Sequence, residues 1–145
     1  MELTISQAVY NQVISYGESD KANEVCGAFL GTKRTATEWT CDEFIPMRNI
    51  SQKGRGSNYT PDPNELFKVL SQTTHMNRDA KKDLIGIFHT HPHHAPIPSS
   101  IDVHGAGYKG FYMIYSPKYT DEKTYFFDGQ TPEFTPTTLI VKDTQ

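Results

Sequence analysis

The sequence has little of what disulfide-rich, membrane-spanning or strongly charged proteins need. Its 145 residues include two cysteines, Cys26 and Cys41, which are too few for a disulfide framework or a four-cysteine metal site. No apolar run approaches the roughly 18 residues that span a membrane, and the first residues lack the basic start and apolar core of a signal peptide. A formal net charge of −3 gives no general attraction to nucleic acid or to an anionic membrane. We therefore expect a cytoplasmic protein with reduced thiols, although one disulfide between the two cysteines stays open.

The length suits one domain over residues 1–145, and we find no repeat or linker. Two segments predict helices. Ser6 can cap a helix that runs to Tyr16, with an apolar face of Val9, Val13 and Ile14. A second helix follows Asp62 as its cap and Pro63 at its first position. Its buried stripe is expected to consist of Leu66, Phe67, Val69 and Leu70.

Short apolar runs predict the strands, and Pro46 is expected to interrupt the second of them. The expected strands cover 24–30, 39–45, 84–89, 111–115, 125–127 and an edge strand at 139–141. The resulting pattern is an α/β fold in which a mixed sheet is flanked by two main helices.

Two histidines, His89 and His91, lie two positions apart at the end of the apolar run 84–88. That run is typical of a buried strand, and side chains at positions i and i+2 of a strand share a face. Asp102 follows after a short loop and can bring a carboxylate to the same place. Two histidines and one carboxylate are the protein ligands of a catalytic zinc site, with water in the fourth position.

The chain carries a two-part motif. An upstream half of the form Glu-x-Cys-Gly-x-x-x-Gly spans Glu24 to Gly31, and a downstream half of the form His-x-His-Pro, six residues, then Ser-x-x-Asp consists of His89, His91, Pro92, Ser99 and Asp102. The two halves together resemble the signature of the JAMM metalloproteases, also called the MPN-plus domain. The element order fits that family across nearly the whole chain. The compact length is similar to prokaryotic or phage-type members.

The resemblance implies one Zn²⁺ per chain, bound by His89, His91 and Asp102 with water as the last ligand. It implies that Glu24 hydrogen-bonds this water, acts as general base and then protonates the leaving amine. Ser99 would stabilise the oxyanion of the tetrahedral intermediate. Ser99 is also expected to cap a helix, in a capping-box relation with Asp102. No cysteine follows Asp102, so we expect no second, structural zinc.

The resemblance further implies a zinc peptidase or isopeptidase. Its expected substrate is a ubiquitin or ubiquitin-like β-grasp protein, cut after a C-terminal glycine tail during deconjugation or precursor processing. The alternative is an inactive MPN scaffold, but all five downstream motif positions are present here. A phosphoesterase would need further histidine pairs, and a nucleobase deaminase would need Pro-Cys-x-x-Cys. We expect neither nucleic-acid nor membrane partners. The modifier, the type of amide bond and a homo-oligomer stay open.

Several of these residues have simpler interpretations. Taken alone, Glu24 would be a surface carboxylate before a strand. Cys26 is expected to be a small buried residue, and His93 and His94 to be exposed in a loop. The polar, glycine-containing loop 51–58 is expected to lie beside the site and to become ordered when a glycine tail binds.

Overall fold

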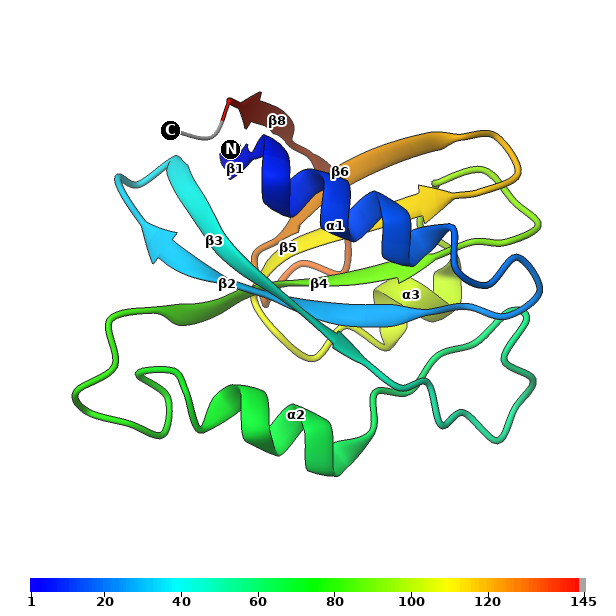
Figure 1. Ribbon diagram of the computed structural model, residues 1–145, viewed down its shortest axis with the longest axis horizontal. Coiled ribbons are helices and arrows are strands. Elements are labelled where there is room, and N and C mark those ends of the chain that lie inside the picture. The colour runs from blue at the N-terminus through cyan, green and yellow to red at the C-terminus, as the bar shows by residue number, and fades with distance from the viewer. Residues whose placement is uncertain (144–145) are drawn as a thin grey trace.

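The computed structural model describes residues 1–143 and contains one mixed eight-stranded sheet and three helices (Figure 1). The strands are β1 (Glu2–Ser6), β2 (Cys26–Lys33), β3 (Glu38–Met47), β4 (Asp83–Thr90), β5 (Gly110–Ser116), β6 (Asp121–Phe127), β7 (Thr135–Pro136) and β8 (Thr138–Lys142). The helices are α1 (Gln7–Gly17), α2 (Pro63–Leu70) and α3 (Ser100–His104). The α/β fold class is confirmed.

The strand order in the sheet is β7-β6-β5-β4-β2-β3-β1-β8. Three neighbouring pairs are parallel, namely β1 with β3, β1 with β8, and β4 with β5, and the others are antiparallel. Helix α1 covers one face of the sheet, and α2 and α3 lie on the other (Figure 1). The apolar strand 84–88 is therefore buried on both sides, which explains its lack of alternation.

Helix α1 begins and ends close to its predicted bounds. The Ser6 hydroxyl accepts a hydrogen bond from the Val9 amide at 3.2 Å, and Val13 is fully buried against the sheet. The same helix covers the edge of β3 beyond the point where β1 ends. There Gln12 and Tyr16 donate side-chain hydrogen bonds to backbone carbonyls of β3, at 3.4 and 3.1 Å.

Helix α2 has the predicted cap, since the Asp62 carboxylate accepts from the Asn64 amide and Pro63 is the first helical residue. Val69 is buried and Leu66 packs beside it in the same core cluster. The expectation that Phe67 belongs to the buried stripe is wrong, because its side chain is 59% exposed. It lies one position after Leu66, which turns it away from the face that contacts the sheet.

Two strands and one proline depart from the prediction. Strand β1 and the two-residue β7 were not predicted, although Leu3 and Ile5 of β1 alternate with half-buried residues. Pro46 does not interrupt β3, which continues to Met47. Beyond Cys41, β3 pairs only with β2, so the missing N–H of Pro46 costs no bond to a second neighbour.

The sheet separates two core clusters. The cluster under α1 contains Phe29, Phe44 and Phe88, and the cluster on the opposite face contains Val69 of α2. The two cysteines belong to different clusters, and both are free and buried. The expectation of unpaired thiols is thus confirmed.

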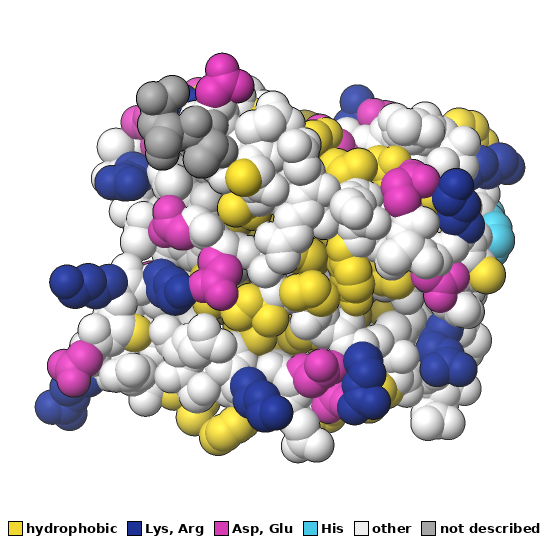
Figure 2. Space-filling view, viewed as in Figure 1, with side chains coloured by type: hydrophobic (Ala, Val, Ile, Leu, Met, Phe, Trp, Pro, Cys, Tyr) yellow, Lys and Arg dark blue, Asp and Glu magenta, His cyan; other side chains and the backbone are white. Residues whose placement is uncertain are grey.

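Acidic and basic side chains are interspersed over the face shown in Figure 2, and hydrophobic side chains gather in a band between α1 and α2. Among the described residues, 1–143, no helix is both long enough and apolar enough to cross a membrane.

The close approach of β2 to β3 yields the first prediction. A Cβ atom on Gly27 would lie 2.5 Å from the Phe44 ring and 2.9 Å from the Ile45 carbonyl oxygen. We expect Gly27→Ala to lower the free energy of unfolding by about 1–3 kcal/mol, as overpacking of cores does. Gly107→Ala is the matched control, because a Cβ there meets nothing within 4 Å. Equal stability of the two variants in denaturant unfolding would contradict this account.

Candidate metal centre

The antiparallel register between β2 and β4 places the two halves of the motif side by side. Cys26 pairs with His89. The Thr90 amide donates to the Val25 carbonyl at 3.1 Å, and the Val25 amide donates to the Thr90 hydroxyl at 3.0 Å. Continuing this register by one residue puts Glu24 opposite His91.

His91 lies just past the end of β4. Its backbone amide still donates to the Tyr115 carbonyl of β5 at 2.9 Å, and Pro92 then ends the pairing. Its ring Nδ1 lies 2.9 Å from the Ala95 carbonyl oxygen. A carbonyl can only accept, so Nδ1 carries the hydrogen and Nε2 faces the site.

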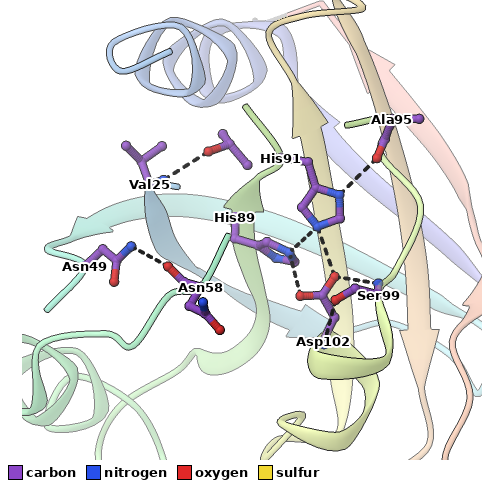
Figure 3. A network of polar contacts seen from close by, with 9 residues as sticks. Val25, Asn49, Asn58, His89, His91, Ala95, Ser99 and Asp102 are labelled. Carbon is purple, nitrogen blue, oxygen red and sulfur yellow. Dashed lines mark hydrogen bonds and ion pairs between the residues drawn. The ribbon is translucent and has the colours of Figure 1, made fainter. Parts of the chain in front are cut away.

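Asp102 is held by the first turn of α3 through a capping box (Figure 3). The Ser99 hydroxyl accepts from the Asp102 amide at 3.0 Å, and the Ser99 amide donates to Asp102 Oδ2 at 2.9 Å. The predicted capping box is confirmed. It also fixes the orientation of the carboxylate, because one oxygen is held by the cap while both oxygens face the histidines.

Three ligand atoms converge from these elements. Asp102 Oδ1 lies 3.1 Å from His89 Nε2, and Asp102 Oδ2 lies 3.0 Å from His91 Nε2. The two Nε2 atoms are 3.2 Å apart. His89 is fully buried, and all three side chains could hold a metal ion together. The structure therefore brings together the three residues that the sequence predicted as ligands.

The chemistry of this cluster fits a cation. Because Nδ1 of His91 donates to Ala95, a neutral His91 directs a lone pair toward a carboxylate that can only accept. Converging acceptors repel one another unless a proton or a metal ion lies between them. Two imidazole nitrogens and one carboxylate oxygen are a ligand set that suits zinc.

The pKa shifts follow from burial and from these contacts. Burial lowers the pKa of His89 below its ordinary value. Burial also opposes protonation of His91, but hydrogen bonds to Asp102 and Ala95 outweigh it and raise the pKa of His91. Burial disfavours the charged form of Asp102, yet its hydrogen bonds with both histidines keep its pKa far below the usual range.

Glu24 is buried, and its Oε1 atom has no hydrogen-bond partner among residues 1–143. Burial is the main cause that raises the pKa of Glu24 to about 8; the charge of Asp102 adds to it and that of His91 opposes it. A nearby metal cation would stabilise the carboxylate and lower this pKa. The simpler interpretation of Glu24 as a surface carboxylate is wrong.

Ser99 is exposed at the rim of the cluster. Its hydroxyl oxygen accepts the capping hydrogen bond from Asp102, which leaves the hydroxyl hydrogen free to donate to another acceptor. The capping role and a role toward a bound substrate are therefore compatible.

Cys26 lies beneath the site as a fully buried residue. Burial raises the pKa of its thiol to about 12, so the thiol is protonated at neutral pH and is a poor nucleophile. His93 and His94 are exposed, as expected, and His93 Nε2 lies 3.3 Å from the Ala22 carbonyl.

Sequence reasoning missed the aromatic wall of the site. The Tyr59 ring stacks on His89, with ring centroids 4.5 Å apart and planes at 20°. Beside it lies a cavity of about 330 Å³. Asp102 lines this cavity together with Ser57, Asn58, Tyr59, Ile101, Tyr108 and Tyr112. The loop 51–58 thus lies beside the site, as expected, whereas its ordering on binding stays a prediction.

The fold and the ligand set define a mixed-sheet domain with a group of two histidines and one aspartate that could hold a metal ion. Residues 6–128 match the family described as prokaryotic homologs of the JAB domain, and this chain belongs to that family. It is 28% identical to a desampylase of Haloferax volcanii over 120 residues, which are 79% of this chain and 81% of that protein.

Two solved structures have the same fold. A protein from Desulfitobacterium hafniense superposes with a TM-score of 0.78 at 20% identity and covers 98% of this chain and 94% of its own. A protein from Salinibacter ruber gives a TM-score of 0.67 at 19% identity, with 95% and 90% covered. At these identities the likeness establishes the fold alone.

The raised pKa of His91 predicts how metal affinity depends on pH. A proton on Nε2 competes with the metal, so Zn²⁺ affinity should fall about tenfold per pH unit once the pH drops below that pKa. Because the pKa is raised, the fall should begin above the pH at which an ordinary histidine protonates. Competition for Zn²⁺ between the protein and a chelator, titrated at several pH values, measures this pH dependence of the affinity.

The same titration tests the ligands. His89→Ala and Asp102→Ala should bind Zn²⁺ far more weakly than the unchanged protein. His104→Ala is the control, since that exposed histidine bonds to the Ser100 carbonyl within α3. Full Zn²⁺ binding by both ligand variants would show that the cluster is not the metal site.

Proposed function

We propose that this chain is a zinc-dependent peptidase or isopeptidase that cleaves after the glycine tail of a ubiquitin-like modifier. One observation carries the proposal: a buried glutamate has a free carboxylate oxygen, and continuing the β2–β4 register puts this residue opposite His91, beside the converged ligands. Membership of the prokaryotic JAB family and the relation to desampylase support it.

His89, His91 and Asp102 would hold the zinc, with the tautomer of His91 fixed by Ala95 and the Asp102 carboxylate fixed by the Ser99 cap. When bound, the ion would act as a Lewis acid that polarises a carbonyl, and it would lower the pKa of water from about 15.7 to about 7.

Glu24 moves the proton in this proposal. Its free Oε1 takes a proton from the attacking water and returns it to the nitrogen of the leaving amine. Burial favours this role, because the carboxyl group accepts a proton more readily in a poorly solvated place. Proton transfer by a positioned carboxylate contributes typically about 10²-fold to 10⁴-fold in rate.

Ser99, at the rim of the histidine–aspartate cluster, stabilises the transition state in this proposal. Its free hydroxyl hydrogen would donate to the oxygen of the scissile carbonyl as negative charge develops there. The cap bond from Asp102 holds the hydroxyl in place, so little reorganisation accompanies the reaction.

The cavity beside Asp102 would receive the substrate chain. The end of the loop, Ser57 and Asn58, lines it together with Ile101 and Asp102 of α3. An extended glycine tail offers backbone donors and acceptors, which can pair with such a loop as an added strand. Glycines next to the scissile bond suit a narrow approach between the loop and the helix.

The test uses ubiquitin that carries an aminomethylcoumarin amide on its C-terminal glycine, and a ubiquitin-like protein fused through its glycine tail. We expect Glu24→Gln to bind Zn²⁺ normally and to lose about 10²-fold to 10⁴-fold in kcat, because the amide cannot take the proton. Near-normal turnover would remove Glu24 as the base. A zinc-loaded protein that cleaves neither probe would favour the scaffold alternative.

Ser99→Ala should retain Zn²⁺ and lose about 10²-fold in kcat, as the loss of one oxyanion donor does. Ser99→Thr is the matched variant, since it keeps both the hydroxyl and the ability to cap α3. Similar rates for Ser99→Ala and the unchanged protein would leave Ser99 with its capping role only.

A further inference from the structure

Both backbone polar groups of Glu24 are bonded to one segment, the loop between β3 and α2, here called the 48–62 loop. The Glu24 amide donates to the Arg55 carbonyl at 2.6 Å. The Glu24 carbonyl accepts from Asn49 Nδ2 at 2.9 Å. Glu24 precedes β2, so it has no ladder of its own to fix it. Its backbone position therefore depends on this loop as well as on the pairing of the next residue, Val25, with Thr90.

The Asn49 side chain makes four hydrogen bonds, all to the backbone. Nδ2 donates to the carbonyls of Glu24 and Asn58, both at 2.9 Å. Oδ1 accepts from the amides of Ser51 and Thr60, both at 3.0 Å. Only one orientation of the amide satisfies all four partners, because its two donors face carbonyls and its acceptor faces two N–H groups.

The base of the 48–62 loop is closed independently of this side chain. The Asp62 amide donates to the Arg48 carbonyl and the Ile50 amide to the Thr60 carbonyl, each at 2.9 Å. An ion pair between the side chains of Arg48 and Asp62 closes the same end. The loop thus has its own scaffold, and Asn49 is the side chain that connects this scaffold to Glu24.

We infer that Asn49 is a positioning residue that places the Glu24 carboxylate by joining its backbone to the 48–62 loop. Its catalytic consequence rests on the proposed function. A displacement of about 1 Å of a catalytic group can cost about 10²-fold in rate. Without Asn49, Glu24 loses one of the two backbone hydrogen bonds that oppose such a shift.

The same connection links the base to the cavity. Asn49 binds the Asn58 carbonyl (Figure 3), and Asn58 lines the cavity. The next residue, Tyr59, stacks on His89. A chain that contacts the loop in the cavity therefore acts on the segment that holds Glu24. Through Asn49, substrate contact with the 48–62 loop would influence the position of the proposed base, Glu24.

The first test needs neither substrate nor activity. Amide hydrogen exchange of Glu24, followed by NMR, should become at least about tenfold faster in Asn49→Ala, because the bond from Asn49 to the Glu24 carbonyl no longer opposes local opening there. Asn49→Asp keeps the acceptor toward Ser51 and Thr60 but loses both donors, so it should also accelerate exchange at Glu24 while keeping the loop folded.

Asn77→Ala is the matched control, because Asn77 also accepts from a turn amide, in the segment between α2 and β4. It should leave exchange at Glu24 unchanged. Unchanged exchange at Glu24 in both Asn49 variants would overturn the inference, whatever the outcome for the proposed activity.

The second test is a double-mutant cycle on the coumarin amide of ubiquitin. If Asn49 acts through Glu24, Asn49→Asp alone lowers kcat by about 10²-fold. The same substitution then has little further effect when Glu24→Gln is already present. An equal loss in both backgrounds overturns the inference. An unchanged protein without turnover counts against the proposed function, and hydrogen exchange then decides the role of Asn49.

Discussion

The pairing register between β2 and β4 is the constraint on which the rest of the site depends. Cys26 lies opposite His89, and Val25 bonds to Thr90, 65 positions away in the sequence. Continuing this register brings Glu24 opposite His91. A slip of one residue would turn every side chain of the strand to the other face of the sheet and would bury the histidines under α1. The two hydrogen bonds between Val25 and Thr90 oppose such a slip.

The sequence could predict those structural features that are determined by residues close together in the chain. The shared face of His89 and His91, the capping box of Ser99 with Asp102, and the start of α2 each depend on residues within a few positions. The placement of Glu24 is different, because it depends on strand pairing between distant segments. Residue reasoning alone favoured a surface carboxylate, and only the family resemblance pointed to the site.

The wrong predictions for Pro46 and Phe67 also arise from contacts between segments that are distant in the sequence. The continuation of β3 through Pro46 depends on where its neighbour β1 ends, and the exposure of Phe67 depends on how α2 contacts the sheet. Tyr59 and Asn49 lie in a polar loop whose sequence marks it as a connector. Their contacts with His89 and Glu24 appear only once the chain has folded. A signal was present in β1, where Leu3 and Ile5 alternate with more exposed residues.

Helix α3 has five residues, far fewer than a helix needs to persist in water by itself. Its capping box includes Asp102, so the group that orients the helix start is also one of the three groups that could hold a metal ion. Whatever binds that carboxylate also lowers the free energy of the folded turn relative to its frayed form. Fraying of α3 and binding at Asp102 are therefore thermodynamically coupled. Binding makes fraying less frequent, and fraying weakens binding.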